Sequence, residues 1–340
     1  MPSGAFPSPT PGTTPGQSSS EPVGVQDVPT RDGTLSAVWI GDGAIVAGGF
    51  TFPSFESTII VFDGTSWSVA DVPGAPGQVT GIAPIGDRLV AVGNGLPDVT
   101  DGFIWDSADG RSWREVEAID GAALYDVVAG HGVVVAVGAR LDAEMNASAA
   151  AWRSTDGSSW EPATVAAPDG TSMGSVAMSP DGFVATGDRP LGFARPLWSS
   201  TSAPRGQSWG SLQNDLAEQL LPADIFHGTT GMALAGATGK SGDQHPFVAQ
   251  STDGGQWDQT SLSLEEGYAS AVGEANGRLV IAGVDADRLT LWSLGGDAWQ
   301  AEEIEAEGAS ISALAWDASW GLVAVGSHDG RHAVWQLGGE

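Results

Sequence analysis

A short apolar strand that ends in glycine recurs along the chain, and this repeat restricts the possible folds more than any other feature. Its first three copies read AIVAG, RLVAVG and VVVAVG. The terminal glycines are Gly48, Gly93, Gly138, Gly187, Gly236, Gly283 and Gly326. They are separated by 45, 45, 49, 49, 47 and 43 residues, which is the length of one propeller blade. The repeat therefore predicts seven blades.

Each repeat contains signals for four short strands, separated by Gly- and Asp-rich turns. The glycine-terminated strand is small and apolar with little alternation, which is typical of a sheet covered on both faces. The last repeat ends near Trp335 without a fourth strand, whereas residues 23–28 resemble the fourth strand that opens at Trp67. We predict an all-β fold: a seven-bladed β-propeller of four-stranded antiparallel blades, closed by this N-terminal strand completing the last blade.

The N-terminal segment differs from the rest of the chain in composition. Residues 1–22 are dominated by Pro, Ser, Thr and Gly and are expected to form a disordered tether, and residues 23–340 the propeller. The tether resembles the stalk of a bacterial surface lipoprotein. This resemblance implies an exported, extracellular or cell-surface protein with an N-terminal lipid anchor in its precursor. We expect a monomer without direct membrane insertion, since no apolar run is long enough to span a bilayer.

Charge and composition exclude several functions. The formal net charge is −29, with 13 Lys and Arg against 42 Asp and Glu. Binding a nucleic-acid backbone needs clustered cations, so no nucleic-acid partner is expected. The chain has no cysteine, which excludes disulfides and thiolate metal sites. No metal site and no cofactor are predicted.

Three turns carry a related motif: SADGRSW, STDGSSW and STDGGQW. They resemble the Asp-box repeat of sialidase-like and photosystem II assembly factor-like propellers, Ser-x-Asp-x-Gly-x-x-Trp, but are one residue shorter between Asp and Trp. The resemblance implies a structural hairpin away from the ligand face, in which the Asp holds the turn and the Trp packs between sheets. The residues concerned are Asp109, Trp113, Asp156, Trp160, Asp253 and Trp257.

Sialidase chemistry would need an arginine cluster, a tyrosine nucleophile paired with a glutamate, and an acid/base carboxylate. The two tyrosines, Tyr125 and Tyr268, lie in or just before first strands of their repeats, and the Arg-Ile-Pro signature is absent. We therefore predict no catalytic residues. A glycoside hydrolase or lyase that uses loop-face carboxylates stays open as an alternative, and a lectin-like module as a second.

The loops between the second and third strands, and those between blades, are expected on one face of the propeller, opposite the Asp-Gly turns. Aromatic and cationic residues gather in these loops, and we predict a face that binds a protein or glycan partner. Phe50, Phe52 and Phe55 are its expected anchors, since exposed aromatics this close together are costly without a cover. The predicted binding residues are Phe50, Phe52, Phe55, Arg140, Arg189, Phe193, Arg195, Lys240, His245, Arg288, His328 and Arg331.

Overall fold

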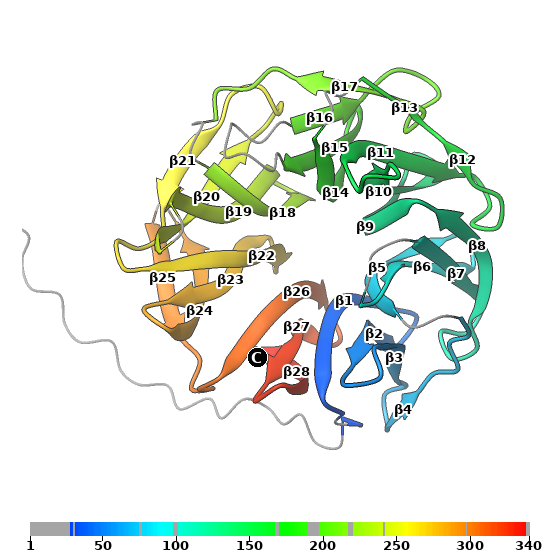
Figure 1. Ribbon diagram of the computed structural model, residues 1–340. Coiled ribbons are helices and arrows are strands. Elements are labelled where there is room, and N and C mark those ends of the chain that lie inside the picture. Colours follow the sequence, from blue (N-terminus) through cyan, green and yellow to red (C-terminus); the bar gives the residue numbers. More distant parts are fainter. Residues whose placement is uncertain are drawn as a thin grey trace, which may run out of the picture.

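A computed structural model of the chain shows a ring of sheets arranged like blades around a central axis (Figure 1). It describes residues 28–29, 31–74, 77–97, 101–166, 170–188, 197–216, 220–240, 242–296 and 298–337. Within these residues there are strands and no helix, and hence no helix long and apolar enough to cross a membrane. The predicted all-β, seven-bladed β-propeller is confirmed. The predicted tether lies outside the described residues.

The strands follow one another around the ring, blade by blade. Blade 1 contains β1 (Gly33–Gly41), β2 (Ala44–Thr51), β3 (Glu56–Phe62) and β4 (Trp67–Val69). Blade 2 contains β5 (Gly77–Ile85), β6 (Arg88–Gly95), β7 (Asp101–Ser107) and β8 (Arg114–Asp120). Blade 3 contains β9 (Ala122–Gly130), β10 (Val133–Leu141), β11 (Ala147–Ser154) and β12 (Glu161–Pro162). Blade 4 contains β14 (Ser172–Ser179), β15 (Gly182–Asp188), β16 (Leu197–Ser200), β17 (Ser208–Leu212) and, from the preceding repeat, β13 (Thr164–Val165). Blade 5 contains β18 (Leu220–Gly228), β19 (Gly231–Lys240), β20 (Asp243–Ser251) and β21 (Asp258–Ser261). Blade 6 contains β22 (Gly267–Ala275), β23 (Arg278–Asp285), β24 (Arg288–Gly295) and β25 (Ala298–Glu303). Blade 7 contains β26 (Ala309–Asp317), β27 (Gly321–His328) and β28 (Arg331–Leu337).

Apart from β13, neighbouring strands within a blade are antiparallel, with the first strand of each blade nearest the axis. The turns between the first and second strands, and between the third and fourth, therefore emerge on one side of the ring, which we call the turn face. The loops between the second and third strands and the links between blades emerge on the other side, the loop face. Outer strands vary more than expected: β13 leaves blade 3 and pairs in parallel with β17 of blade 4.

The ring closes between blades 7 and 1, which lie side by side in Figure 1. In the described residues blade 7 has three strands. The incoming chain runs beside β28, since Gly33 N donates to Gly330 O (2.8 Å) and His332 N donates to Arg31 O (3.0 Å). Val28 is buried in a cluster that includes Val334 of β28. The remainder of the predicted closing strand, residues 23–27, lies outside the described residues.

The hydrophobic core is divided among the interfaces between blades. Seven buried clusters each join residues of two neighbouring blades. Alanines and valines of the second strands fill the narrow inner part, while Trp105, Trp198 and Trp292 are completely buried farther out. Large aromatic rings suit the outer region because neighbouring blades diverge there and leave more volume to fill. This arrangement makes the loops at the ends of the blades available for other contacts.

Candidate functional site

The three Asp-Gly turns on the turn face use their polar groups internally. Asp109 Oδ1 accepts hydrogen bonds from the backbone N–H of Ser112 and Arg111, both at 2.8 Å, and these bonds hold the pKa of Asp109 below its ordinary value. Trp113 Nε1 donates to Gly110 O at 2.8 Å. Asp156 with Trp160, and Asp253 with Trp257, make the same contacts. These carboxylates therefore stabilise their own turns.

Two aspartates and a serine form a polar cluster in the innermost strands. Ser175 of β14 lies between Asp126 of β9 and Asp224 of β18, with its Oγ 3.0 Å from Asp126 Oδ2 and 2.8 Å from Asp224 Oδ1. Each of the four carboxylate oxygens also accepts a backbone N–H, from Val127 (2.7 Å), Val176 (2.8 Å), Ile225 (2.8 Å) and Val272 (3.0 Å). The cluster thus links four consecutive blades, from blade 3 to blade 6.

This cluster favours one proton more than the serine supplies. The Ser175 hydroxyl can donate to only one of its two carboxylate neighbours, so the second contact is favourable when the other aspartate is protonated and donates to Ser175 Oγ. Burial is the main cause that raises the pKa of Asp126, to about 7, and the nearby Asp224 carboxylate raises it further. Burial also raises the pKa of Asp224. We assign the extra proton to Asp126, and conclude that the cluster is a proton-dependent tie between blades.

The structure brings several predicted cations of the loop face against acidic residues. Arg140 differs, since its guanidinium carbon lies 5.5 Å from the centroid of the Trp152 ring. Lys240 is exposed, and Arg189, Phe193 and Arg195 lie outside the described residues. The contacts between a predicted cation and an acidic residue are Arg288 with Glu303 (3.0 Å), Arg331 with Asp32 (3.5 Å), His245 with Asp243 (3.3 Å) and His328 with Asp329 (3.9 Å). The predicted cations among the described residues therefore do not form one shared anion site.

Acidic residues outnumber cations on the described part of this face. Besides the partners above, the loops and strand ends carry Glu56, Asp101, Asp120, Asp142, Glu144, Glu265, Glu266, Asp285, Asp287, Glu305 and Glu307. No three or more His, Asp or Glu residues of the described ranges are arranged to hold a metal ion. The described part of this face thus favours a cationic ligand over an anionic one.

The three predicted phenylalanine anchors lie together at the loop-face end of blade 1. The ring centroids of Phe50 and Phe52 are 4.9 Å apart, and those of Phe52 and Phe55 are 5.5 Å apart. The Phe52 side chain remains 47% exposed. Phe55 has a φ of 54°, a left-handed conformation that costs a bulky residue about 1–2 kcal/mol. The chain therefore holds a strained loop that presents an aromatic cluster to solvent.

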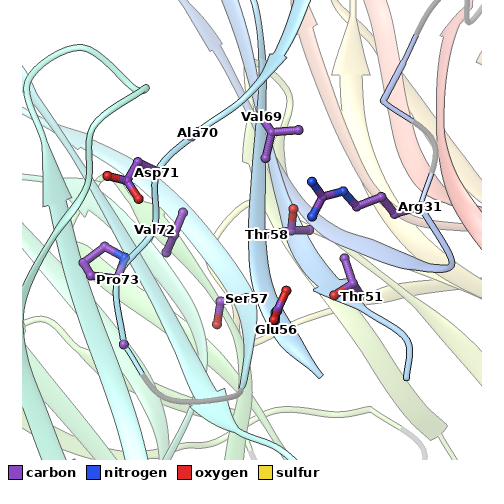
Figure 2. A pocket seen from close by; sticks show the side chains of 11 residues that line it. Arg31, Thr51, Glu56, Ser57, Thr58, Val69, Ala70, Asp71, Val72 and Pro73 are labelled. Carbon is purple, nitrogen blue, oxygen red and sulfur yellow. The ribbon is translucent and has the colours of Figure 1, made fainter. Parts of the chain in front are cut away.

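A hollow of about 450 Å³ opens beside this cluster. Figure 2 shows Arg31 and Thr51 on one side of the hollow and the segment from Val69 to Pro73 on the other, with Glu56, Ser57 and Thr58 between them. Thr51 and Glu56, which line the hollow, are direct sequence neighbours of the phenylalanines, although no phenylalanine side chain is among the lining residues. The volume lies within the range of ligand-binding pockets.

The hollow exists because the outer strand leaves its blade early. Pairing between β3 and β4 ends where Ala70 N donates to Ile59 O (2.8 Å). The chain then crosses to blade 2, where Asp71 N donates to Arg111 O (2.8 Å) and Trp113 N donates to Asp71 O (3.0 Å). It returns to β3 when Gly77 N donates to Phe55 O. The edge of β3 between these two contacts lines the hollow, and no strand of the described residues pairs with it there.

Sequence reasoning identified the phenylalanines but missed Glu56, Ser57 and Thr58. No local pattern marks these residues, since they become accessible only when the fourth strand departs. The axial cluster had a signal: Asp126, Ser175 and Asp224 are spaced by 49 residues, like the repeat glycines of the same blades. Polar residues at one repeat position of a buried strand indicate a shared structural role.

Comparison with solved structures finds similar folds to different degrees. A structure of YCF48 bound to D1 peptide matches with a TM-score of 0.64 and 16% sequence identity, over 92% of this chain and 94% of that chain. The Hadza microbial sialidase Hz136 matches with a TM-score of 0.47 and 14% identity, over 82% of this chain and 66% of that chain. A mutant of Trypanosoma rangeli sialidase displaying trans-sialidase activity matches with a TM-score of 0.46 and 12% identity, over 90% of this chain and 53% of that chain. Comparisons with protein families and with curated proteins find no match. At these identities, the likeness shows the fold alone.

Proposed function

We propose that this protein is a non-catalytic binding propeller that holds a protein partner against its loop face, with blade 1 as the main contact. The observation that carries the proposal is the aromatic cluster of Phe50, Phe52 and Phe55, in the same loop as Thr51 and Glu56, which line a 450 Å³ hollow. Binding energy at protein interfaces concentrates in aromatic anchors that lie beside pockets. The peptide bound to YCF48 in a similar fold supports a protein partner over a glycan.

Exposed apolar side chains elsewhere on the loop face support a broad contact. Among the described residues, Met145 is 55%, Leu264 is 88% and Tyr268 is 42% exposed, and all three lie in loop-face loops or strand ends. Together with Phe52 they are distributed around the rim. Scattered apolar contacts of this kind, surrounded by charged residues, are typical of a non-obligate protein interface.

The chemistry of the carboxylates supports a role without catalysis. A glycoside hydrolase needs two carboxylates that both face the substrate. Asp126 and Asp224, whose pKa values are raised, instead have their oxygens occupied by backbone N–H groups. The expected extracellular or cell-surface location belongs to this proposal, so partners are to be sought in the surface fraction of the host.

Site-specific photocrosslinking tests the proposal. A benzophenone amino acid replaces Phe52 in one protein and Met178, which is exposed on the turn face, in a second. We expect a crosslinked protein from the surface fraction at position 52 and none at 178. Equal crosslinking from both faces, or none from either, would refute the assignment of the loop face.

The captured partner, once purified, gives a quantitative test. The double substitution Phe52→Ala with Phe55→Ala is expected to weaken its binding about tenfold or more, as the loss of hot-spot residues does. Met178→Ala, a matched loss of an exposed apolar side chain on the turn face, is the control and should leave affinity within about threefold. Unchanged binding by the double variant would exclude the aromatic cluster as the anchor, and binding abolished by deglycosylation of the partner would favour a glycan ligand.

A further inference from the structure

We propose that the hollow in blade 1 takes a short extended segment of a basic polypeptide, which pairs with the backbone of Ser57 as an added strand. This inference rests on the proposed function and specifies the chemistry of the partner at that site. It is argued from the open edge of β3, from the equivalent edge in blade 3, and from the charges that line the hollow.

Ser57 presents its backbone to the hollow. In an antiparallel strand, alternate residues direct both N–H and C=O to the same side. Ile59 O accepts its hydrogen bond from Ala70 on the outer side, so Ser57, two residues earlier, also faces outward. No described residue makes a backbone hydrogen bond to Ser57 on that side, and its buried Oγ likewise has no partner among the described residues. A peptide residue placed there can make both bonds of an antiparallel pair.

In blade 3 the position equivalent to Ser57 has a hydrogen-bond partner within the protein. Its outer strand also leaves early, after Ala163 N donates to Ala151 O, and Gly170 N donates to Ala147 O. The residue between these contacts is Ala149, the counterpart of Ser57, and its N–H is directed to Thr171 Oγ1 (3.4 Å). In blade 3 a side chain of the protein itself therefore accepts the backbone N–H that the open edge would otherwise leave without a partner. In the described part of blade 1 no side chain does so.

The size of the open edge limits the ligand. Four residue steps separate Phe55 from Ile59, which corresponds to about 13 Å of strand, and the hollow measures about 450 Å³. Contacts at Gly77 and Ala70 close both ends of this edge. The ligand is therefore two or three extended residues, provided by a chain end or by the tip of a hairpin.

Charge favours a basic segment. The lining contains two carboxylates, Glu56 and Asp71, and one cation, Arg31. The chain as a whole carries a formal charge of −29, which attracts cationic partners over long distances. Lysine or arginine side chains next to the paired residue can reach the two carboxylates, while backbone pairing with Ser57 needs no particular side chain.

The test uses synthetic peptides. A library of five-residue peptides, randomised at the three central positions, is selected on the immobilised full chain in low salt. We expect enrichment of Lys and Arg and depletion of Pro, with the best peptides binding more tightly than about 1 mM. Enrichment of Asp and Glu, indifference to Pro, or no enrichment at all would overturn the proposal.

Two protein variants then test the backbone pairing with the best selected peptide. Ser57→Pro removes the outward N–H, which an edge position tolerates, whereas Ser57→Ala keeps it. We expect the proline variant to bind about three- to tenfold more weakly, as for the loss of one hydrogen bond, and the alanine variant to bind within about twofold of the wild type. Methylation of the central peptide nitrogen should cause a similar loss without any change to the protein. Equal binding in all these experiments would overturn strand addition.

Charge variants test the chemistry of the ligand. Glu56→Gln should weaken the selected peptide about two- to fivefold, and Arg31→Gln should strengthen it; the opposite signs would show an acidic ligand. These outcomes are separable from those of the proposed function. If Phe52→Ala with Phe55→Ala releases the crosslinked partner while Ser57→Pro does not, the loop face binds a partner but the strand-addition proposal is wrong.

Discussion

Asp126→Asn tests whether the cluster of Asp126, Ser175 and Asp224 is a proton-dependent tie between blades. The pKa of Asp126 is raised from 3.8 to about 7, mainly by burial. A carboxyl whose pKa is higher in the folded state binds more protons when folded, so its contribution to stability is complete below about pH 4 and is lost as the pH rises towards 7. Asparagine cannot titrate and removes this dependence.

The size of the effect follows from the shift. A shift of about three pKa units corresponds to about 4 kcal/mol in the free energy of unfolding. Both aspartates retain some accessible surface, and solvent screening reduces the figure, so we expect about 2–4 kcal/mol between pH 4 and pH 8. For a propeller of this length the unfolding entropy is about 0.6 kcal/mol/K, and the melting temperature should change by about 3–7 °C. The amide also leaves one backbone N–H without an acceptor, at a cost of about 1–3 kcal/mol at every pH.

The assay is thermal unfolding of wild type and variant from pH 5 to pH 8. We expect the variant to be less stable at pH 5, and the difference between the two proteins to shrink as the pH rises. Asp87→Asn is the control, because Asp87 is exposed in the β5–β6 turn and the same substitution there removes a carboxyl group outside the cluster. Parallel curves for wild type and Asp126→Asn, with a constant difference across this range, would refute the assignment of the proton.

Three further predictions concern the ring. Val28→Asp places a charge in the cluster between blades 7 and 1 and should lower the unfolding free energy by about 3 kcal/mol or more; an unchanged melting temperature would contradict this contact. Asp156→Ala removes the acceptor for two turn N–H groups and should cost about 1 kcal/mol in urea unfolding, whereas Ser158→Ala should cost little. Burial disfavours the charged form of Asp106, but its hydrogen bonds and ion pairs with arginines, including Arg88, outweigh this and lower its pKa. Asp106→Asn should therefore destabilise the protein by about 1–3 kcal/mol at pH 7, and this difference should begin to shrink as the pH falls below about 4 and disappear as the pH falls through the lowered pKa of Asp106; a difference that stays the same from pH 7 down to pH 2 would be inconsistent with the ion pairs.

The architecture could be predicted because it repeats. Each glycine from Gly48 to Gly326 marks the same point of a blade, and a pattern seen seven times averages out local ambiguity. The crossing of β13 to blade 4 was not predictable in this way. It depends on backbone hydrogen bonds between different repeats, such as Thr164 N to Gln207 O (2.8 Å), and the side chains concerned leave no periodic signal.

The candidate site was only partly predictable for a related reason. The cluster of Phe50, Phe52 and Phe55 is local, so its density of aromatic residues is visible in the sequence. Whether a loop cation is available depends instead on what lies across the ring or the strand. Arg331 meets Asp32, which is distant in the sequence, and Arg288 meets Glu303 on the neighbouring strand. Sequence alone showed the scarcity of cations but not how they are paired.

The open edge of blade 1 and the joint between blades 1 and 2 have a common origin. When Asp71 crosses to blade 2 it makes two backbone hydrogen bonds there, with Arg111 and Trp113. These two hydrogen bonds take the place of the two backbone hydrogen bonds that a longer β4 would have made with Ser57. The number of backbone hydrogen bonds is therefore unchanged, while the ring gains a contact between blades 1 and 2. The exchange leaves backbone groups of Ser57 facing the hollow, where water can reach them. In the proposed strand addition the ligand would replace that water with two backbone hydrogen bonds, and a net gain of about 0.5–1.5 kcal/mol for each bond would favour an extended chain over a compact solute.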